Sequence, residues 1–368
     1  MNDQRLYQIA LCFVPQVGAV TAKTLLSYCG SAEEVFRAGR KSVLKIPGIG
    51  PVVADALHRP EIFDLAEREL RLAEEHGLEV LLYTDERYPA RLRQNVDCPY
   101  LLFFKDSDAH LLNARRMAAI VGTRQPSDYG RMMCEELVEG LAAYDVAIVS
   151  GLAYGIDVVA HRKAAGIRIP NIAVLGHGLG SIYPGEHRPV AMRILERGGL
   201  LSEYPFHTPP DREHFPMRNR IIAGMCDFLL VVETAETGGS MISAELACQY
   251  EREVFAVPGR AKDAKSAGCN RLIKNEKARM VESVADIAQA LRWDEIDRRP
   301  GIQTQLFTEL SPDQAQVVEL VRKFPEIQVD ALAAAAGKSP GLLAALILEL
   351  EFKGVLRTLP GKRFVLNG

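Results

Sequence analysis

The chain has 368 residues, of which 48% are hydrophobic and 25% are charged, and its formal net charge is −3. A chain of this length can bury a full hydrophobic core and is expected to form about two or three domains. The slightly negative charge excludes a global attraction to nucleic acid, so any DNA binding must come from a local cluster of arginine and lysine residues.

The seven cysteines are scattered singly, without a C-x-x-C pair. This usage predicts a reducing compartment, with neither a disulfide framework nor a zinc site. The first residues lack the basic and apolar regions of a signal peptide, and no apolar run reaches the ~18 residues of a membrane span. We therefore expect a cytoplasmic protein that does not enter a membrane.

Residues 1–76 show the pattern of short helices. Ser31 and Glu34 have the spacing of a capping box and predict a helix that begins after Ser31. The segment 46–50, IPGIG, is followed by the helical run PVVADAL and resembles a helix-hairpin-helix motif. Its backbone amides could hold a DNA phosphate. It could equally be a tight turn in a protein-interaction module, and both interpretations stay open.

Residues 77–292 are expected to form an extended α/β domain. Two apolar runs, LEVLLY and YLLFF, predict a hairpin at the edge of the sheet, with Tyr88-Pro89 in the loop between them. From about residue 111, apolar strands alternate with helical segments. This alternation predicts a doubly wound parallel sheet of about six or seven strands. A closing helix is expected after Ser283.

Residues 293–308 are charged and contain proline, which predicts a linker to a last domain at 309–368. Helical periodicity in three segments, followed by a strand–turn–strand signal, predicts a winged helix. Ser339 and Pro340 are expected to begin its third helix. A helix that reads DNA should carry basic residues, but LLAALILELEFKG carries two Glu and one Lys. We therefore favour a protein-interaction or vestigial role for this domain.

Glycine-rich turns follow the strands of the central domain, and in a doubly wound sheet such turns gather at the carboxyl ends of the strands. Glycine lets the backbone approach a phosphate, hydroxyl groups donate hydrogen bonds, and arginine adds a bidentate charge. Burying arginines between apolar residues is costly without a partner, which points to an anionic ligand. The segments that carry this phosphate-binding hypothesis are Gly122-Thr123-Arg124, Arg218-Asn219-Arg220 and Gly238-Gly239-Ser240.

A catalytic interpretation rests on Asp157 and His161, which are spaced i, i+4 on a helix and could form an acid–base pair. The sequence contains no nucleophile elbow, no Walker A motif and no H-E-x-x-H metal motif. We favour a packed His161 held by Asp157. His177, which lies between glycines, could face a ligand or be exposed in a loop.

Several motifs in chain order resemble those of the DNA-processing protein A family (DprA, also called Smf): VGTR, SGLAYGID, LLSEYP, FPMRNRIIAG, ETGGSMISAELA, VFAVPG and GCNRLI. The resemblance implies a Rossmann-like central domain between a helical, SAM-like N-terminal domain and a winged helix. It also implies a dimer, formed through the Rossmann-like domain, that binds and protects single-stranded DNA and loads RecA recombinase in natural transformation. It implies neither catalysis nor a cofactor.

The resemblance implies a DNA pocket built from these motifs, in which amides and arginines hold phosphates without reading bases. Phe215 could stack on a base or belong to the core. Two departures from the family pattern are Asn275-Glu276-Lys277, where Gly-Ala is usual, and Gly180, where Asp is usual. The implied DNA-binding residues are Gly122, Thr123, Arg124, Ser150, Gly151, Ala153, Gly155, Phe215, Arg218, Asn219, Arg220, Gly238, Gly239 and Ser240.

Two alternatives stay open. The arrangement Gly238-Gly239-Ser240 with Glu245 resembles a signature of the lysine-decarboxylase-like nucleoside-monophosphate phosphoribohydrolases. In that enzyme Arg124 would hold the phosphate and Glu245 would act in glycosidic cleavage. A nucleotide sensor is the other alternative, and it would bind mononucleotides as well as oligomers.

Overall fold

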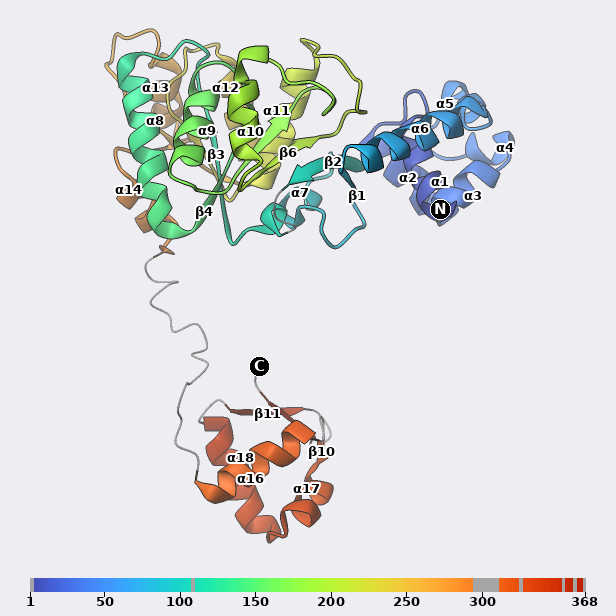
Figure 1. The fold of residues 1–368 in the computed structure, drawn as a ribbon, viewed down its shortest axis with the longest axis vertical. Helices are drawn as coiled ribbons and strands as arrows, with labels where there is room; N and C mark the ends of the chain where they lie inside the picture. The colour runs from blue at the N-terminus through green and yellow to red at the C-terminus, as the bar shows by residue number, and fades with distance from the viewer. Residues whose placement is uncertain are drawn as a thin grey trace. The chain divides into compact units, whose positions relative to one another are not determined.

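The computed structural model describes residues 3–106, 110–293, 311–323, 327–352, 355–359 and 363–366. The chain divides into two compact units, residues 1–291 and residues 292–368 (Figure 1). Each unit has its own hydrophobic core.

The first unit begins with six helices. The predicted cap at Ser31 is confirmed, because its hydroxyl accepts a hydrogen bond from the N–H of Glu34 at 3.2 Å. In the IPGIG segment, Gly48 has a φ of 80°, and Pro51 begins the following helix. The positive φ makes glycine the favoured residue in this turn. The helices are α1 (Asp3–Cys12), α2 (Ala19–Cys29), α3 (Ala32–Arg37), α4 (Arg40–Val43), α5 (Pro51–Ala56) and α6 (Glu61–Glu75).

A nine-stranded sheet follows, in the order β1-β2-β6-β5-β4-β3-β7-β8-β9. The seven strands from β3 to β9 are parallel, whereas β1 and β2 form the predicted antiparallel edge hairpin. The predicted α/β fold is therefore confirmed. The strands are β1 (Glu79–Leu82), β2 (Leu101–Asp106), β3 (Arg116–Val121), β4 (Val146–Ser150), β5 (Asn171–Leu175), β6 (Gly199–Ser202), β7 (Phe228–Val231), β8 (Glu253–Ala256) and β9 (Arg279–Met280).

Helices cover both faces of the sheet, and alternate residues of each strand point to opposite faces. In β5, Ile172 and Val174 pack with the helices of one face, whereas Ala173 and Leu175 pack with those of the other. On the first face lie α11 (His214–Met225), α12 (Gly239–Gln249) and α13 (Ala267–Lys274). On the second face lie α9 (Ile156–Gly166) and α10 (Arg188–Ile194), and α8 (Asp128–Leu141) packs against α9.

The edge hairpin joins the N-terminal helices to the sheet. Leu102 and Phe104 of β2 belong to the core of the sheet, whereas Leu101 and Phe103 belong to the core of the helices. Phe206, from the loop after β6, also lies in the helical core and stacks on the ring of His76. The N–H of Phe206 donates a hydrogen bond to the Glu69 carboxylate at 2.5 Å. The helices are thus fastened to two separate segments of the α/β domain.

The two departures from the family pattern have local structural features. A Cβ atom on Gly180 would lie 2.7 Å from the carbonyl oxygen of Phe206, so close backbone packing favours glycine there. At the other departure, α13 ends with Asn275 as its C-cap, and Glu276 has a φ of 56°. Beyond it, α14 (Val284–Ala290) begins after Ser283 as predicted, and the N–H of Ser283 donates to Asp286 at 2.8 Å.

In its described residues the second unit has the predicted winged-helix arrangement, with three helices and a three-stranded sheet in the order β10-β12-β11. The hydroxyl of Ser339 accepts a hydrogen bond from the N–H of Leu342 at 3.4 Å, as expected for a helix start. The predicted linker lies outside the described residues except for Trp293, which is buried. The elements are α16 (Pro312–Lys323), β10 (Ile327–Gln328), α17 (Val329–Ala336), α18 (Pro340–Phe352), β11 (Leu356–Leu359) and β12 (Arg363–Leu366).

Throughout the described parts of the chain, no helix is both long enough and apolar enough to cross a membrane.

Candidate functional site

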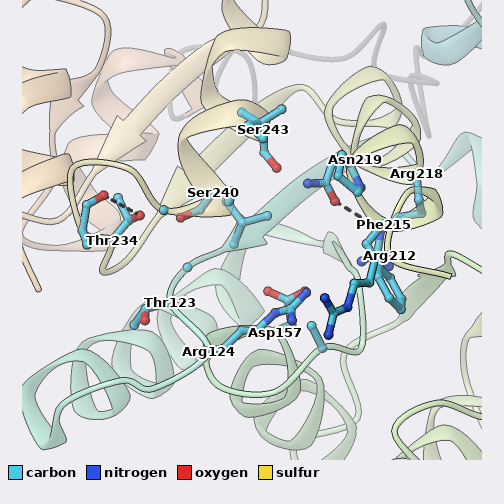
Figure 2. A pocket seen from close by; sticks show the side chains of 18 of the residues that line it. Thr123, Arg124, Asp157, Arg212, Phe215, Arg218, Asn219, Thr234, Ser240 and Ser243 are labelled. Carbon is cyan, nitrogen blue, oxygen red and sulfur yellow. Dashed lines mark hydrogen bonds between the residues drawn. The ribbon is translucent and has the colours of Figure 1, made fainter. Parts of the chain in front are cut away.

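A cavity of about 660 Å³ opens at the point where the strand order reverses, beside the carboxyl ends of β3 and β7. This is the position where doubly wound sheets bind ligands. Figure 2 shows residues from several loops and helices converging on it. Most of the predicted residues line the cavity: Gly122, Thr123, Arg124, Ala153, Phe215, Arg218, Asn219, Gly238, Gly239 and Ser240.

The turn after β3 is fixed by backbone hydrogen bonds on both sides. The N–H of Thr123 donates to the carbonyl of Glu233 at 2.6 Å, and the carbonyl of Thr123 accepts from the N–H of Ile156 at 3.1 Å. Behind the turn, Gly155 has a φ of 81°, and a Cβ atom there would lie 2.1 Å from the carbonyl oxygen of Thr123. Gly155 therefore shapes the turn from behind and does not line the cavity.

The floor of the cavity contains a buried charge pair. The Arg218 side chain donates hydrogen bonds to the carbonyl of Gly151 at 2.7 Å and to the carbonyl of Val174. The N–H of Gly151 in turn donates to the Asp157 carboxylate at 3.1 Å. Burial lowers the pKa of Arg218 to about 10 and raises the pKa of Asp157, while the attraction between the two opposite charges opposes both shifts. The negative charge of Asp157 is therefore compensated inside the site.

The mouth of the cavity combines cations with aromatic rings. Arg124 is exposed, and its guanidinium lies 5.8 Å from the centroid of the Phe215 ring. Phe215 stacks with Tyr183, their centroids being 5.8 Å apart. Arg212, also exposed, lines the same cavity. Exposed guanidinium groups beside aromatic faces suit a ligand that has both negative charges and flat rings.

The opposite side of the cavity presents hydrogen-bond donors. Gly238 is the N-cap of α12, so the N–H groups of Gly239 and Ser240 have no partner within the helix, and both residues line the cavity. The Ser240 hydroxyl is buried and has no hydrogen-bond partner among the described residues. Figure 2 shows Ser240 and Thr234 across the cavity from the arginines. Cations on one side and hydrogen-bond donors on the other give the cavity groups that are chemically suited to an anion.

Four predicted residues lie outside the lining. Ser150 is buried and donates its hydroxyl to the carbonyl of Ile120 at 2.6 Å. Gly151 and Gly155 support the site from behind, as described above. Arg220 points away from the cavity, where it pairs with Glu203 and donates to the carbonyl of Asp97 at 2.6 Å.

The sequence analysis missed other lining residues. Tyr183 was given no role, and Asp157 was considered only for catalysis. Arg212 stands three residues before Phe215 in the segment DREHF, and that basic residue beside an aromatic one was an available signal. The additional lining residues include Asp157, Tyr183, Arg212, Thr234 and Ser243.

The candidate catalytic residues have other partners. His161 is fully buried and its Nδ1 is hydrogen-bonded to Asn171 at 2.8 Å, so the expectation that Asp157 holds it is wrong. Burial lowers the pKa of His161 to about 4. His177 is also buried, and its Nδ1 lies 2.9 Å from the carbonyl oxygen of Gly178. The Glu245 side chain is 58% exposed, lies 4.0 Å from Lys277 and does not line the cavity.

Among the residues that the structure describes, no group of three or more His, Cys, Asp or Glu side chains could hold a metal ion.

Comparisons with known proteins agree across all three parts of the chain. A family model described as DNA recombination-mediator protein A matches residues 79–292. A DprA winged helix domain matches residues 303–362, and a SAM-like helix-hairpin-helix tandem matches residues 9–59. Protein Smf of Escherichia coli K12 is 38% identical over 75% of this chain and 74% of its own length.

Two solved structures are similar in fold. DNA processing protein A from Streptococcus pneumoniae superposes with a TM-score of 0.65 at 30% identity, covering 78% of this chain and 98% of that chain. DNA processing protein A from Helicobacter pylori, described for its single-stranded DNA binding mode, gives a TM-score of 0.54 at 29% identity. That match covers 59% of this chain and 96% of that chain.

Proposed function

The chain belongs to the DNA recombination-mediator protein A (DprA/Smf) family, and on that premise we propose that it binds single-stranded DNA in the cavity described above. The observation that carries the proposal is the pairing of exposed arginines and aromatic rings with the N-terminus of α12 around one open cavity. The binding mode described for the Helicobacter pylori relative supports the same ligand.

The arrangement favours a strand over a mononucleotide. Arg124 and Arg212 are exposed at the mouth, where they would contact successive phosphates of a chain. Phe215 and Tyr183 would offer ring faces to bases, a contact that tolerates any sequence. The amides of α12 and the Ser240 hydroxyl would hold one phosphate in the interior. Ser150, Gly151 and Gly155 would fix the shape of the cavity, and Arg220 would stabilise the fold.

We propose no catalytic step. The carboxylate that the phosphoribohydrolase alternative requires, Glu245, is exposed to solvent beside Lys277 and outside the cavity. Of the described residues that line the cavity, Asp157 is the only acid, and Arg218 compensates its charge. We therefore give Asp157 no role in proton transfer.

The family premise extends the proposal to the whole protein. It would act in the cytoplasm as a homodimer formed through the Rossmann-like domain, protect incoming DNA and load RecA recombinase in natural transformation or homologous recombination. Met280 is 52% exposed on β9, the strand at one edge of the sheet, and an open edge of this kind can pair with another chain. Leu342 and Leu348 on α18 are also exposed, which supports a protein-interaction role for the winged helix.

Fluorescence anisotropy with labelled dT oligomers of increasing length, at several salt concentrations, tests the proposal. We expect binding that strengthens with length, weakens with salt and resists competition by AMP. Full displacement by AMP would indicate a nucleotide sensor. Release of free adenine from AMP at high protein concentration would support the hydrolase. Sedimentation at micromolar concentration should show a dimer, and a strict monomer would contradict that part of the proposal.

A further inference from the structure

A second hollow lies near the cavity at the ends of β3 and β7, which is called the pocket below. The hollow lies between the start of α8 and the loop 257–266 that joins β8 to α13. Its volume is about 730 Å³, and its lining includes Ser127, Tyr129, Pro258 and Arg260. The loop is held in place by Asn270, whose side chain bonds both the N–H and the carbonyl of Gly259 at 3.1 Å. Nothing described so far uses this hollow.

The loop carries a concentration of positive charge. Arg260, Lys262 and Lys265 are all exposed, and none of them forms an ion pair within the described parts of the chain. Two carboxylates, Asp128 and Asp263, also line the hollow. The Asp263 carboxylate is engaged locally, since it accepts a hydrogen bond from the N–H of Lys265 at 3.0 Å. The segment 260–265 itself therefore carries three positive charges against one negative charge, in a chain whose net charge is −3, whereas the other lining carboxylate, Asp128, belongs to α8.

The hollow is connected to the pocket by the segment 124–129. The Lys265 ammonium donates to the carbonyl of Gln125 at 3.0 Å, directly after Arg124 at the mouth of the pocket. Tyr129 lies five residues beyond Arg124, so the two are at most about 18 Å apart. A single oligonucleotide can span such a distance.

Tyr129 supplies an aromatic surface in the hollow. Its side chain is exposed, and its hydroxyl donates to the carbonyl of Pro258 at 3.0 Å, which ties the ring to the basic loop. Carboxylates of Glu282, Glu136 and Glu233 also lie near Tyr129, so the positive charge of this surface comes from the loop alone. An exposed ring tied to a basic loop is a combination that single-stranded nucleic acid binds without sequence preference.

We infer that the hollow is a second subsite for single-stranded DNA, reached by the strand after it leaves the pocket past Arg124. Arg260, Lys262 and Lys265 would hold its phosphates, and Tyr129 would stack on a base. The inference rests on the proposed function. It adds the path of the DNA strand, which would run from the pocket across Gln125 to the loop 257–266.

The test compares the wild-type protein with the triple variant R260A/K262A/K265A on two dT oligomers. These are a short one of about six nucleotides, which lies within the range that one binding groove covers, and a long one of about 25, which exceeds it. For the long oligomer we expect at least a tenfold loss of affinity at ~0.1 M salt. The slope of log K against log salt should fall in magnitude by about 2, because three phosphate contacts are removed. Affinity for the short oligomer should stay within about twofold.

A matched control removes three exposed arginines elsewhere. Arg162, Arg193 and Arg197 lie on the C-terminal halves of α9 and α10 or just after α10, towards the amino-terminal edge of the parallel strands. R162A/R193A/R197A changes the net charge equally and should retain most of the affinity for the long oligomer. Tyr129→Leu should weaken binding of the long oligomer about tenfold, whereas Tyr129→Phe should restore most of it, because the ring is kept.

Three outcomes would overturn the inference. The first is a basic-loop variant with unchanged affinity and unchanged salt slope on the long oligomer. The second is an equal loss on both oligomers, which would mean that the loop only supports the pocket. The third is an equal loss in the control variant, which would indicate general attraction. Absence of binding by the wild-type protein itself would instead refute the proposed function, so the two failures are distinguishable.

Discussion

The side chain of Arg218 donates a hydrogen bond to the carbonyl of Gly151 at 2.7 Å, and the N–H of Gly151 donates one to the Asp157 carboxylate at 3.1 Å. Arg218 is 4% exposed. Its position fixes the end of β4 and the start of α11 relative to each other. Arg218 therefore lines the cavity and also holds its wall together, so its replacement should affect folding as well as binding.

Replacing Arg218 by Leu should lower the free energy of unfolding by about 3–5 kcal/mol, because it leaves the buried Asp157 carboxylate without its compensating charge. The double variant R218L/D157N should recover part of that loss, since the uncompensated charge is gone. Urea unfolding followed by circular dichroism measures both. An R218L protein as stable as the wild type would show that the pair does not stabilise the fold.

Replacing Arg124 by Ala should weaken DNA binding and leave the stability of the fold almost unchanged. Arg124 is exposed, so stability should stay within about 0.5 kcal/mol of the wild type. The slope of log K against log salt for single-stranded DNA should fall in magnitude by about 0.7, the value of one phosphate contact on a single strand. Arg162→Ala is the matched control. Identical slopes for R124A and R162A would remove Arg124 from the binding site.

Replacing Gly155 by Ala should destabilise the protein by at least about 2 kcal/mol, because the residue has a positive φ and its Cβ would collide with the backbone of Thr123. Gly239→Ala is the control, since a Cβ there meets no atom within 4 Å. Thermal melts should separate the two variants clearly. Similar melting temperatures would contradict the geometry of the turn after β3.

His161 should make the protein less stable in acid. Burial holds its pKa at about 4, below the 6.5 of an unperturbed histidine, so the unfolded chain binds a proton first as the pH falls. Stability is therefore lost progressively from about pH 6.5 to about pH 4, by roughly 3 kcal/mol for this group. The midpoint of urea unfolding should decrease between pH 7 and pH 5, and this decrease should be smaller in His161→Gln than in the wild type. Equal decreases would contradict this contribution of His161.

The order of strands and helices was predictable because buried parallel strands leave continuous apolar runs in the sequence. β9 was not predicted, since it consists of only Arg279 and Met280, both exposed. Such a short strand forms because β8 offers an unpaired edge, and that edge is not visible in the local sequence.

The site was harder to predict, because the sequence does not show which way a side chain points. Successive residues of a helix turn by about 100°, so Arg218 and Arg220 lie about 200° apart and cannot both face one cavity. That rule was available from the sequence, but it does not say which arginine faces inward. The neighbours of Arg220 decide this, since Glu203 and Asp97 come from distant segments.

The insertion of Phe206 into the core of the N-terminal helices has a consequence for synthesis of the protein. The helices end at Glu75, but their core also needs Leu101, Phe103 and Phe206, which are translated later. At translation rates of about 5–20 residues per second, the interval between residues 76 and 206 is roughly 7 to 26 seconds. During that time the apolar surface that Leu101, Phe103 and Phe206 cover in the finished fold stays open, so we expect the oldest part of the chain to finish folding late.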